Sequence, residues 1–76
     1  MYQLTDEQLK QLEVRFSYHP PKDTQWERYG AIRDMAKKYA QLLMESCPDS
    51  RELSLALTHL DECVMMANAA IARNEQ

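Results

Sequence analysis

An apolar residue recurs at every third or fourth position in the last third of this 76-residue chain. The row comprises Leu53, Leu57, Leu60, Val64, Ala67 and Ile71. This spacing places all its members on one side of an α-helix for about three heptads, a pattern typical of helices that pack lengthwise. A second row of similar length precedes it, formed by Tyr29, Ile32, Ala36, Tyr39 and Leu43. The two rows predict two long helices that pack along their apolar sides.

Prolines and capping residues indicate where the helices begin and end. Pro20 and Pro21 exclude a helix just before them, and Pro48 separates the two apolar rows with a short turn. An antiparallel helical hairpin follows. Thr5-Asp6-Glu7-Gln8 is predicted to be a capping box that starts a short first helix.

Two further caps complete the expected fold. We expect Thr24-Gln25-Trp26-Glu27 to form a second capping box, and Asp49 or Ser50 to cap the last helix. The fold class is therefore predicted to be all-α, with a short N-terminal helix followed by the hairpin. We expect one domain over residues 1–76, with helices at about 6–16, 24–46 and 50–74.

The apolar surface is larger than one hairpin can bury. The first helix is expected to turn an inner face toward the hairpin, formed by Leu9, Leu12 and Phe16. The last helix has a second apolar line, formed by Ala56, Cys63, Met66 and Ala70. A helix that is apolar on two faces needs two partners. We therefore expect a homo-oligomer.

The cysteines and hydropathy favour a cytoplasmic protein. Cys47 and Cys63 are expected too far apart on the hairpin to form a disulfide, and no histidine is spaced to complete a zinc site. No apolar run approaches the length that crosses a membrane, and no signal peptide is recognisable. We expect reduced thiols, no cofactor and no metal.

Net positive charge is confined to one segment. Residues 15–38 contain six basic and three acidic side chains, although the chain as a whole has a net charge of −3. Proteins that coat duplex DNA are basic over a whole face. A small anion with few phosphates suits this local charge better than a nucleic-acid polymer does.

The basic segment also carries four of the six aromatic residues, namely Phe16, Tyr18, Trp26 and Tyr29. Aromatic rings stack on bases, and cationic side chains neutralise phosphates. Tyr18, beside His19 in a proline-containing loop, has no periodic reason to be buried. Other candidates have structural alternatives: Tyr29 begins an apolar row, and the helical arginines could form a solvated face paired with Glu27 and Asp34. No catalytic constellation is recognisable, so an enzyme is not expected.

Three stretches resemble a known family. RFSYHPPK, ERYGAIRDMA and SLALTHLDECVMMANAAIARNE are similar to the phage-encoded anti-CBASS and Thoeris anti-defence helical-hairpin proteins, over about residues 15–75. The resemblance implies a homohexamer that sequesters cyclic nucleotide immune signals without cleaving them, inside an infected bacterial cell. Some relatives carry a strand region before the hairpin, and its absence here favours cyclic di- and trinucleotides over cyclic ADP-ribose isomers. Many relatives have glycine where this chain has Asp23.

The resemblance also implies a site. One pocket between protomers would use Tyr18, His19 and Pro20, with Arg28 and Arg33 from the following helix. A second pocket would use Arg73 and Asn68. The full set of candidate ligand-binding residues is Phe16, Tyr18, His19, Pro20, Lys22, Arg28, Tyr29, Arg33, Asn68 and Arg73.

Two other functions remain open from the residues. A helical interaction protein could bind an acidic partner through the aromatic-basic segment. A small dimeric regulator could bind nucleic acid, although the acidic overall charge opposes it.

Overall fold

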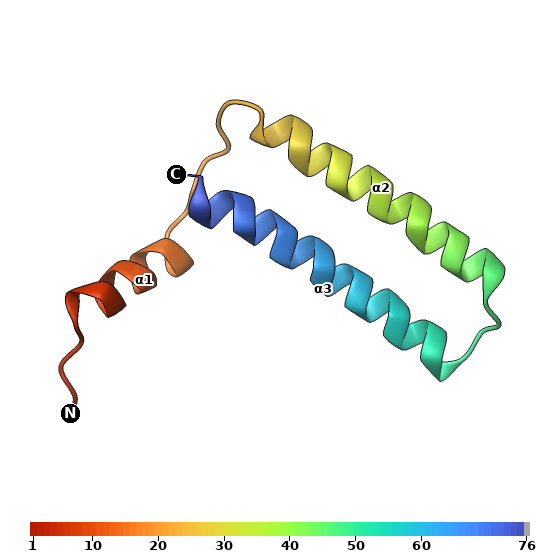
Figure 1. Ribbon diagram of the computed structural model, residues 1–76, viewed down its shortest axis with the longest axis horizontal. Coiled ribbons are helices and arrows are strands. Elements are labelled where there is room, and N and C mark those ends of the chain that lie inside the picture. The colour runs from red at the N-terminus through yellow and green to blue at the C-terminus, as the bar shows by residue number, and fades with distance from the viewer. Residues whose placement is uncertain (76) are drawn as a thin grey trace.

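The computed structural model describes residues 1–75 and contains three helices in this range (Figure 1). These are α1 (Asp6–Phe16), α2 (Gln25–Ser46) and α3 (Arg51–Asn74). The predicted all-α fold class, with a short helix before a long hairpin, is confirmed.

Helices α2 and α3 form the hairpin. They lie side by side and run in opposite directions from the short turn that joins them (Figure 1). Leu53 is buried near the turn, and most of the remaining apolar row of α3 is half-buried against α2. The spacing of three and four therefore gives a seam between two helices and no enclosed core.

Helix α1 does not close onto this hairpin. It projects away from the open end of the hairpin (Figure 1), and it makes at most a slight contact with either long helix. The expected inner face is wrong for the single chain, because Leu9, Leu12 and Phe16 are all exposed. The short segment between Phe16 and α2 directs α1 outward, so these side chains have no surface within the described chain to pack on.

The caps explain two of the three helix starts. At α1, the Thr5 hydroxyl accepts a hydrogen bond from Gln8 N (3.1 Å) and the Gln8 side chain accepts one from Thr5 N (3.0 Å), so this capping box is confirmed. At α3, the Ser50 hydroxyl accepts from Leu53 N (3.1 Å). Of the two expected candidates, Asp49 and Ser50, the serine therefore caps α3.

The capping box expected at Thr24 is wrong. Thr24 has a ψ of 8° in place of the extended backbone usual for an N-cap, and its side chain makes no capping hydrogen bond. Its hydroxyl instead accepts a hydrogen bond from Arg28 Nε (3.1 Å). The preceding Asp23 has a φ of 52°, in the left-handed region that favours glycine. The turn into α2 is therefore tighter than a standard helix start.

The described chain is flat. Its extents are 51 × 36 × 13 Å, and the shortest is close to the diameter of one helix with its side chains, about 10–12 Å. The two long helices thus form a single layer, with both broad sides uncovered.

Candidate functional site

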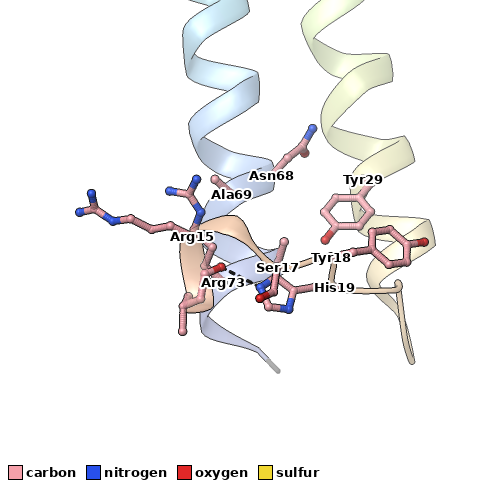
Figure 2. Close-up of a pocket in the computed structure, with 10 residues that line it drawn as sticks. Arg15, Ser17, Tyr18, His19, Tyr29, Asn68, Ala69 and Arg73 are labelled. Carbon is pink, nitrogen blue, oxygen red and sulfur yellow. Dashed lines mark hydrogen bonds between the residues drawn. The ribbon is translucent and has the colours of Figure 1, made fainter. Parts of the chain in front are cut away.

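A pocket of about 450 Å³ lies at the open end of the hairpin, where the α1–α2 loop passes the start of α2 and the end of α3 (Figure 2). Its walls come from all three regions of the chain. The lining residues are Val14, Arg15, Ser17, Tyr18, His19, Tyr29, Asn68, Ala69, Ala72 and Arg73. Because Ala69 and Ala72 are small, the α3 wall leaves room between the larger side chains.

Aromatic and cationic groups lie on different sides of this pocket. Figure 2 shows the rings of Tyr18 and Tyr29 near α2, and the guanidinium groups of Arg15 and Arg73 on the other side. Tyr29 is half-buried, whereas Tyr18 is 84% exposed. The single chain therefore leaves most of the Tyr18 ring uncovered and available for stacking.

His19 holds the loop against the end of α1. Its Nε2 lies 2.8 Å from the Val14 carbonyl oxygen, which can only accept, so the ring nitrogen donates. The family resemblance implied that His19 is part of the ligand pocket. In this structure its Nε2 donates to the backbone of α1, and its ring also lines the pocket.

Asn68 places an unsatisfied acceptor at the pocket wall. Its Oδ1 is inaccessible to solvent and has no hydrogen-bond partner among the described residues. An unpaired buried acceptor costs about 1–3 kcal/mol. Figure 2 shows the amide directed from α3 toward the α2 side of the pocket. The family resemblance implied a second pocket for Asn68 and Arg73. In the single chain both residues line the same pocket as Tyr18 and His19.

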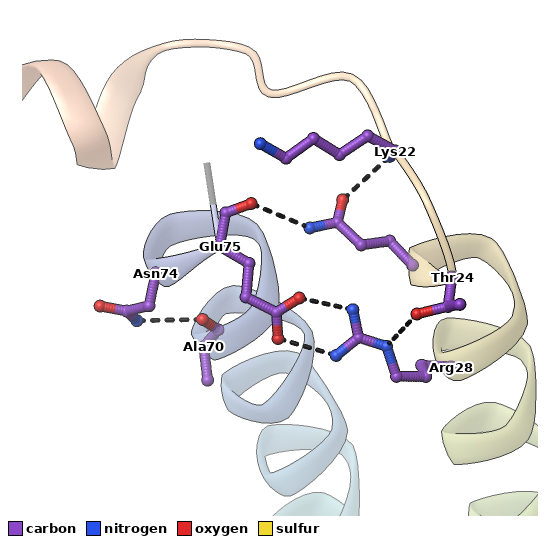
Figure 3. Close-up of polar contacts among 7 residues, drawn as sticks. Lys22, Thr24, Arg28, Ala70, Asn74 and Glu75 are labelled. Atoms are coloured by element: carbon purple, nitrogen blue, oxygen red, sulfur yellow. Dashed lines mark hydrogen bonds and ion pairs between the residues drawn. The ribbon is translucent and has the colours of Figure 1, made fainter.

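Arg28 belongs to a different arrangement at the same end of the hairpin (Figure 3). Its Nη1 and Nη2 donate to the two carboxylate oxygens of Glu75 at 2.7 and 2.5 Å. Gln25 lies beside this pair, with its Nε2 3.4 Å from the Glu75 carbonyl oxygen. We call Gln25, Arg28 and Glu75 the terminal cluster.

The contacts within the terminal cluster shift the pKa of both its charged members. Hydrogen bonding to the Glu75 carboxylate raises the pKa of Arg28 above its usual value. The same bond, with the positive charges of Arg28 and Lys22, lowers the pKa of Glu75. Both groups therefore remain charged at neutral pH and hold the ion pair.

The remaining candidates lie apart from the pocket. Phe16 is 80% exposed. Pro20 and Lys22 line a smaller pocket of about 220 Å³ beside Gln25 and Glu75. Arg33 lines a separate groove along the hairpin with Lys37 and Asp61. A single chain therefore brings together five of the ten expected residues, Tyr18, His19, Tyr29, Asn68 and Arg73.

Sequence reasoning missed several residues of this region. Arg15 and Ser17 line the pocket, and both lie in the aromatic-basic segment that the sequence singled out. Gln25 and Glu75 gave no local signal, because they act through contacts with residues about 50 positions away.

A third surface is almost wholly apolar. A groove of about 540 Å³ runs between the two long helices, lined by Ala31, Ile32, Met35, Ala36, Tyr39, Leu60, Cys63, Val64 and Ala67. We call it the hairpin groove. Met35 and Tyr39 are more than half exposed on it. A soluble monomer rarely leaves such a surface open to water.

Metal sites and membrane-spanning helices are both absent from residues 1–75. No group of three His, Cys, Asp or Glu side chains in this range could hold a metal ion. Among the helices of the same range, none is long and apolar enough to span a lipid bilayer.

Comparison with known proteins gives one match. A family model described as the Acb2/Tad1 hairpin domain matches residues 8–72, which is 65 of the 76 residues. None of the curated proteins and none of the solved structures matches the chain. The matched span contains all of α2 and nearly all of the pocket lining, and it ends one residue before Arg73.

Proposed function

The chain belongs to the Acb2/Tad1 hairpin family, which binds cyclic nucleotide signals, and we propose from this membership that it sequesters cyclic di- and trinucleotides of CBASS defence without cleaving them. Such a sponge lowers the free concentration of the signal, so that the host effector stays inactive. The proposed ligand site is the pocket at the open end of the hairpin.

The observation that carries this proposal is the chemistry of the pocket lining. Two tyrosines can stack on bases, and two arginines can neutralise phosphates. Among residues 1–75 no carboxylate lines the pocket, although the whole chain has twelve acidic and nine basic residues. The lining is therefore more positively charged than the protein as a whole, and a positively charged lining suits an anionic ligand.

The same lining supports binding without cleavage. His19 is the pocket side chain best suited to act as a general base, and one of its two ring nitrogens, Nε2, carries a proton that it donates to a backbone carbonyl, so this nitrogen cannot take a proton from a ligand. The other polar groups are hydroxyls, guanidinium groups and one amide, which orient and neutralise a ligand. We therefore propose that the ligand is held and later released intact.

The assembly is also part of the proposal. A compact monomer of 8.9 kDa exposes about 4,800 Å², whereas this chain exposes 6642 Å². A standard interface removes about 800 Å² from each partner, so the excess corresponds to roughly two interfaces per chain. We propose that copies of the chain cover the hairpin groove and the apolar residues of α1, and the family resemblance favours a hexamer. A neighbouring copy would also border the pocket on the side of Tyr18, so that the ligand lies between two protomers.

A binding screen tests the proposed function. The purified protein is titrated by calorimetry with cyclic dinucleotides, cyclic trinucleotides and cyclic ADP-ribose isomers, and the bound ligand is recovered by heating and analysed by chromatography. We expect a cyclic di- or trinucleotide to bind and to be recovered intact. Binding of an ADP-ribose isomer alone would replace CBASS by Thoeris as the target, and recovery of a linear product would contradict sequestration.

A substitution at Tyr18 tests the site. We expect Tyr18→Ala to weaken binding by about 5- to 150-fold, because stacking on one base contributes roughly 1–3 kcal/mol. Tyr2→Ala is the matched control, since Tyr2 is exposed before α1 and lines none of the pockets described above. Equal affinities of Tyr18→Ala and the parent would exclude Tyr18 from the site.

A further inference from the structure

We propose that Arg28 is a positioning residue for the pocket and not a contact for the ligand: through Glu75, and together with Gln25, it fixes the end of α3 and the α1–α2 loop in the arrangement that forms the pocket. This inference rests on the proposed function of the pocket, and it reassigns a basic residue that the sequence placed on the ligand.

The hydrogen bonds of Arg28 already use the binding edge of its guanidinium group. Two nitrogens form a bidentate pair with Glu75, and Nε donates to the Thr24 hydroxyl at 3.1 Å (Figure 3). This fork is the geometry by which arginine binds a phosphate. A ligand phosphate could therefore bind Arg28 in the same way only by displacing Glu75.

Gln25 connects the loop to the same point. It is 4% exposed, and its Oε1 accepts a hydrogen bond from Lys22 N at 3.1 Å. Its Nε2 lies 3.4 Å from the carbonyl oxygen of Glu75. One buried amide therefore links the loop to Glu75, the residue that directly follows α3, across 50 positions of sequence.

The terminal cluster lies next to the walls of the pocket. The loop that Gln25 holds supplies Ser17, Tyr18 and His19 to the lining. The end of α3 that Glu75 holds supplies Asn68 and Arg73, and Ala72 borders both this pocket and the smaller one beside Gln25. Loss of the cluster would allow loop and helix to move apart, so the ligand would have to order them on binding.

Two opposite consequences distinguish positioning from direct contact. If Arg28 only positions the pocket, loss of the Glu75 charge weakens ligand binding, because the cluster loosens. If Arg28 contacts the ligand, loss of that charge strengthens binding, because a competing carboxylate disappears. The Glu75→Gln variant keeps the size of the side chain and removes its charge, so it separates the two cases.

The experiment measures affinity for 3′,3′-cyclic GMP-AMP in four proteins: the parent, Arg28→Met, Glu75→Gln and the double variant. We expect each single variant to bind about three- to tenfold more weakly, the cost of ordering one or two side chains, and the double variant to be no weaker than either. Arg28→Lys should restore part of the affinity. Tighter binding by Glu75→Gln would overturn the proposal.

Hydrogen exchange gives a readout that needs no ligand. In the free protein, Glu75→Gln should speed exchange of the Lys22 amide, which donates to Gln25, and leave the capped Leu53 amide at the hairpin turn unchanged. Unchanged exchange at Lys22 would contradict the positioning role. If the parent binds no cyclic nucleotide while Lys22 exchange still accelerates, the proposed function fails and the link between loop and α3 stands.

Matched controls lie at the other end of the hairpin. Glu45→Gln removes an exposed carboxylate near the end of α2, and Arg51→Met removes an exposed arginine at the start of α3. Neither residue lines the pocket or belongs to the terminal cluster. Both variants should bind and exchange like the parent, and a loss of affinity in them equal to that of Glu75→Gln would show a general charge effect.

Discussion

At the scale of single residues, Asn68 lowers the stability of the folded chain, and no contact among the described residues offsets this loss. Its Oδ1 is buried without a partner, in the middle of a run of alanines that would pack well without it. Residues that lower stability without local compensation are expected at functional sites. We infer that the ligand contacts this amide and that the oxygen becomes accessible on binding, when it accepts a hydrogen bond from an exocyclic amino group or a ribose hydroxyl.

This gives a first prediction. Asn68→Ala removes an unsatisfied acceptor, so the melting temperature of the free protein should stay the same or rise, while the affinity for a cyclic nucleotide falls about tenfold, the value of one hydrogen bond to a buried group. Thermal unfolding and calorimetry measure the two effects. A lower melting temperature with unchanged affinity would show that Asn68 bonds a neighbouring copy and not the ligand.

Asp23 is the second residue with a local cost. Its φ of 52° is tolerated by aspartate but is unfavourable for most side chains. Glycine would adopt this backbone conformation without a steric cost. The turn is also the place where Gln25 N donates to Lys22 O, at 3.0 Å, just before α2 begins.

The second prediction compares two substitutions there. Asp23→Gly should be more stable than Asp23→Ala by about 1 kcal/mol, because alanine in the left-handed region costs about 1–2 kcal/mol and glycine loses part of that gain to backbone entropy. Urea unfolding of both variants measures the difference. Equal stability would mean that the turn adopts another backbone conformation in solution.

At the scale of elements, α1 differs from the two long helices. It has 11 residues and a complete capping box, yet none of its residues is buried. Isolated helices shorter than about 12–15 residues are marginal in water. The apolar residues Leu9 and Leu12 therefore need a surface from another copy if α1 is to remain folded.

The third prediction concerns that surface. Leu12→Glu should shift the protein to smaller species in sedimentation experiments, because it places a charge on the exposed apolar side of α1. The helical content of the hairpin should persist, since α1 packs little on it. Gln3→Glu adds the same charge outside the helix and serves as the control. Unchanged assembly in Leu12→Glu would remove α1 from the interface.

At the scale of the whole molecule, the flat shape leaves apolar surface that a second copy of the chain would have to cover. A single layer of helices leaves the hairpin groove open, and the groove holds one of the two cysteines. Cys47 follows α2 at the hairpin turn, away from the groove lining. Both thiols are free and exposed in the single chain. The reactivity of the Cys63 thiol therefore reports on whether the groove is covered, and the Cys47 thiol serves as the reference.

The fourth prediction uses this pair. At concentrations that support assembly, a maleimide reagent should modify Cys63 more slowly than Cys47, because a second copy covers the groove. Dilution below the dissociation constant of the assembly should bring the two rates closer together, and mass spectrometry of peptides measures both. Equal rates at high concentration would show that the groove stays open and that other surfaces make the interface.

The sequence alone determined the helices and their pairing. Three local signals sufficed: apolar spacings of three and four residues, two prolines before α2 and one after it, and the caps at Thr5 and Ser50. Each signal acts within a few positions of the sequence, so it can be recognised from the sequence alone. The local signal at Thr24 gave a wrong prediction. Its hydroxyl was expected to cap α2, but it accepts a hydrogen bond from Arg28, one turn later.

The tertiary structure decided the composition of the candidate site. The sequence indicated the segment that holds Tyr18, His19 and Tyr29, but it separated them from Asn68 and Arg73, which lie about 40 to 55 positions further on. It also gave no sign that Arg28 pairs with Glu75, 47 positions away. These contacts depend on how the loop turns back and on the register between α2 and α3. Helix formation is driven by neighbours in sequence, whereas a pocket is formed by neighbours in space.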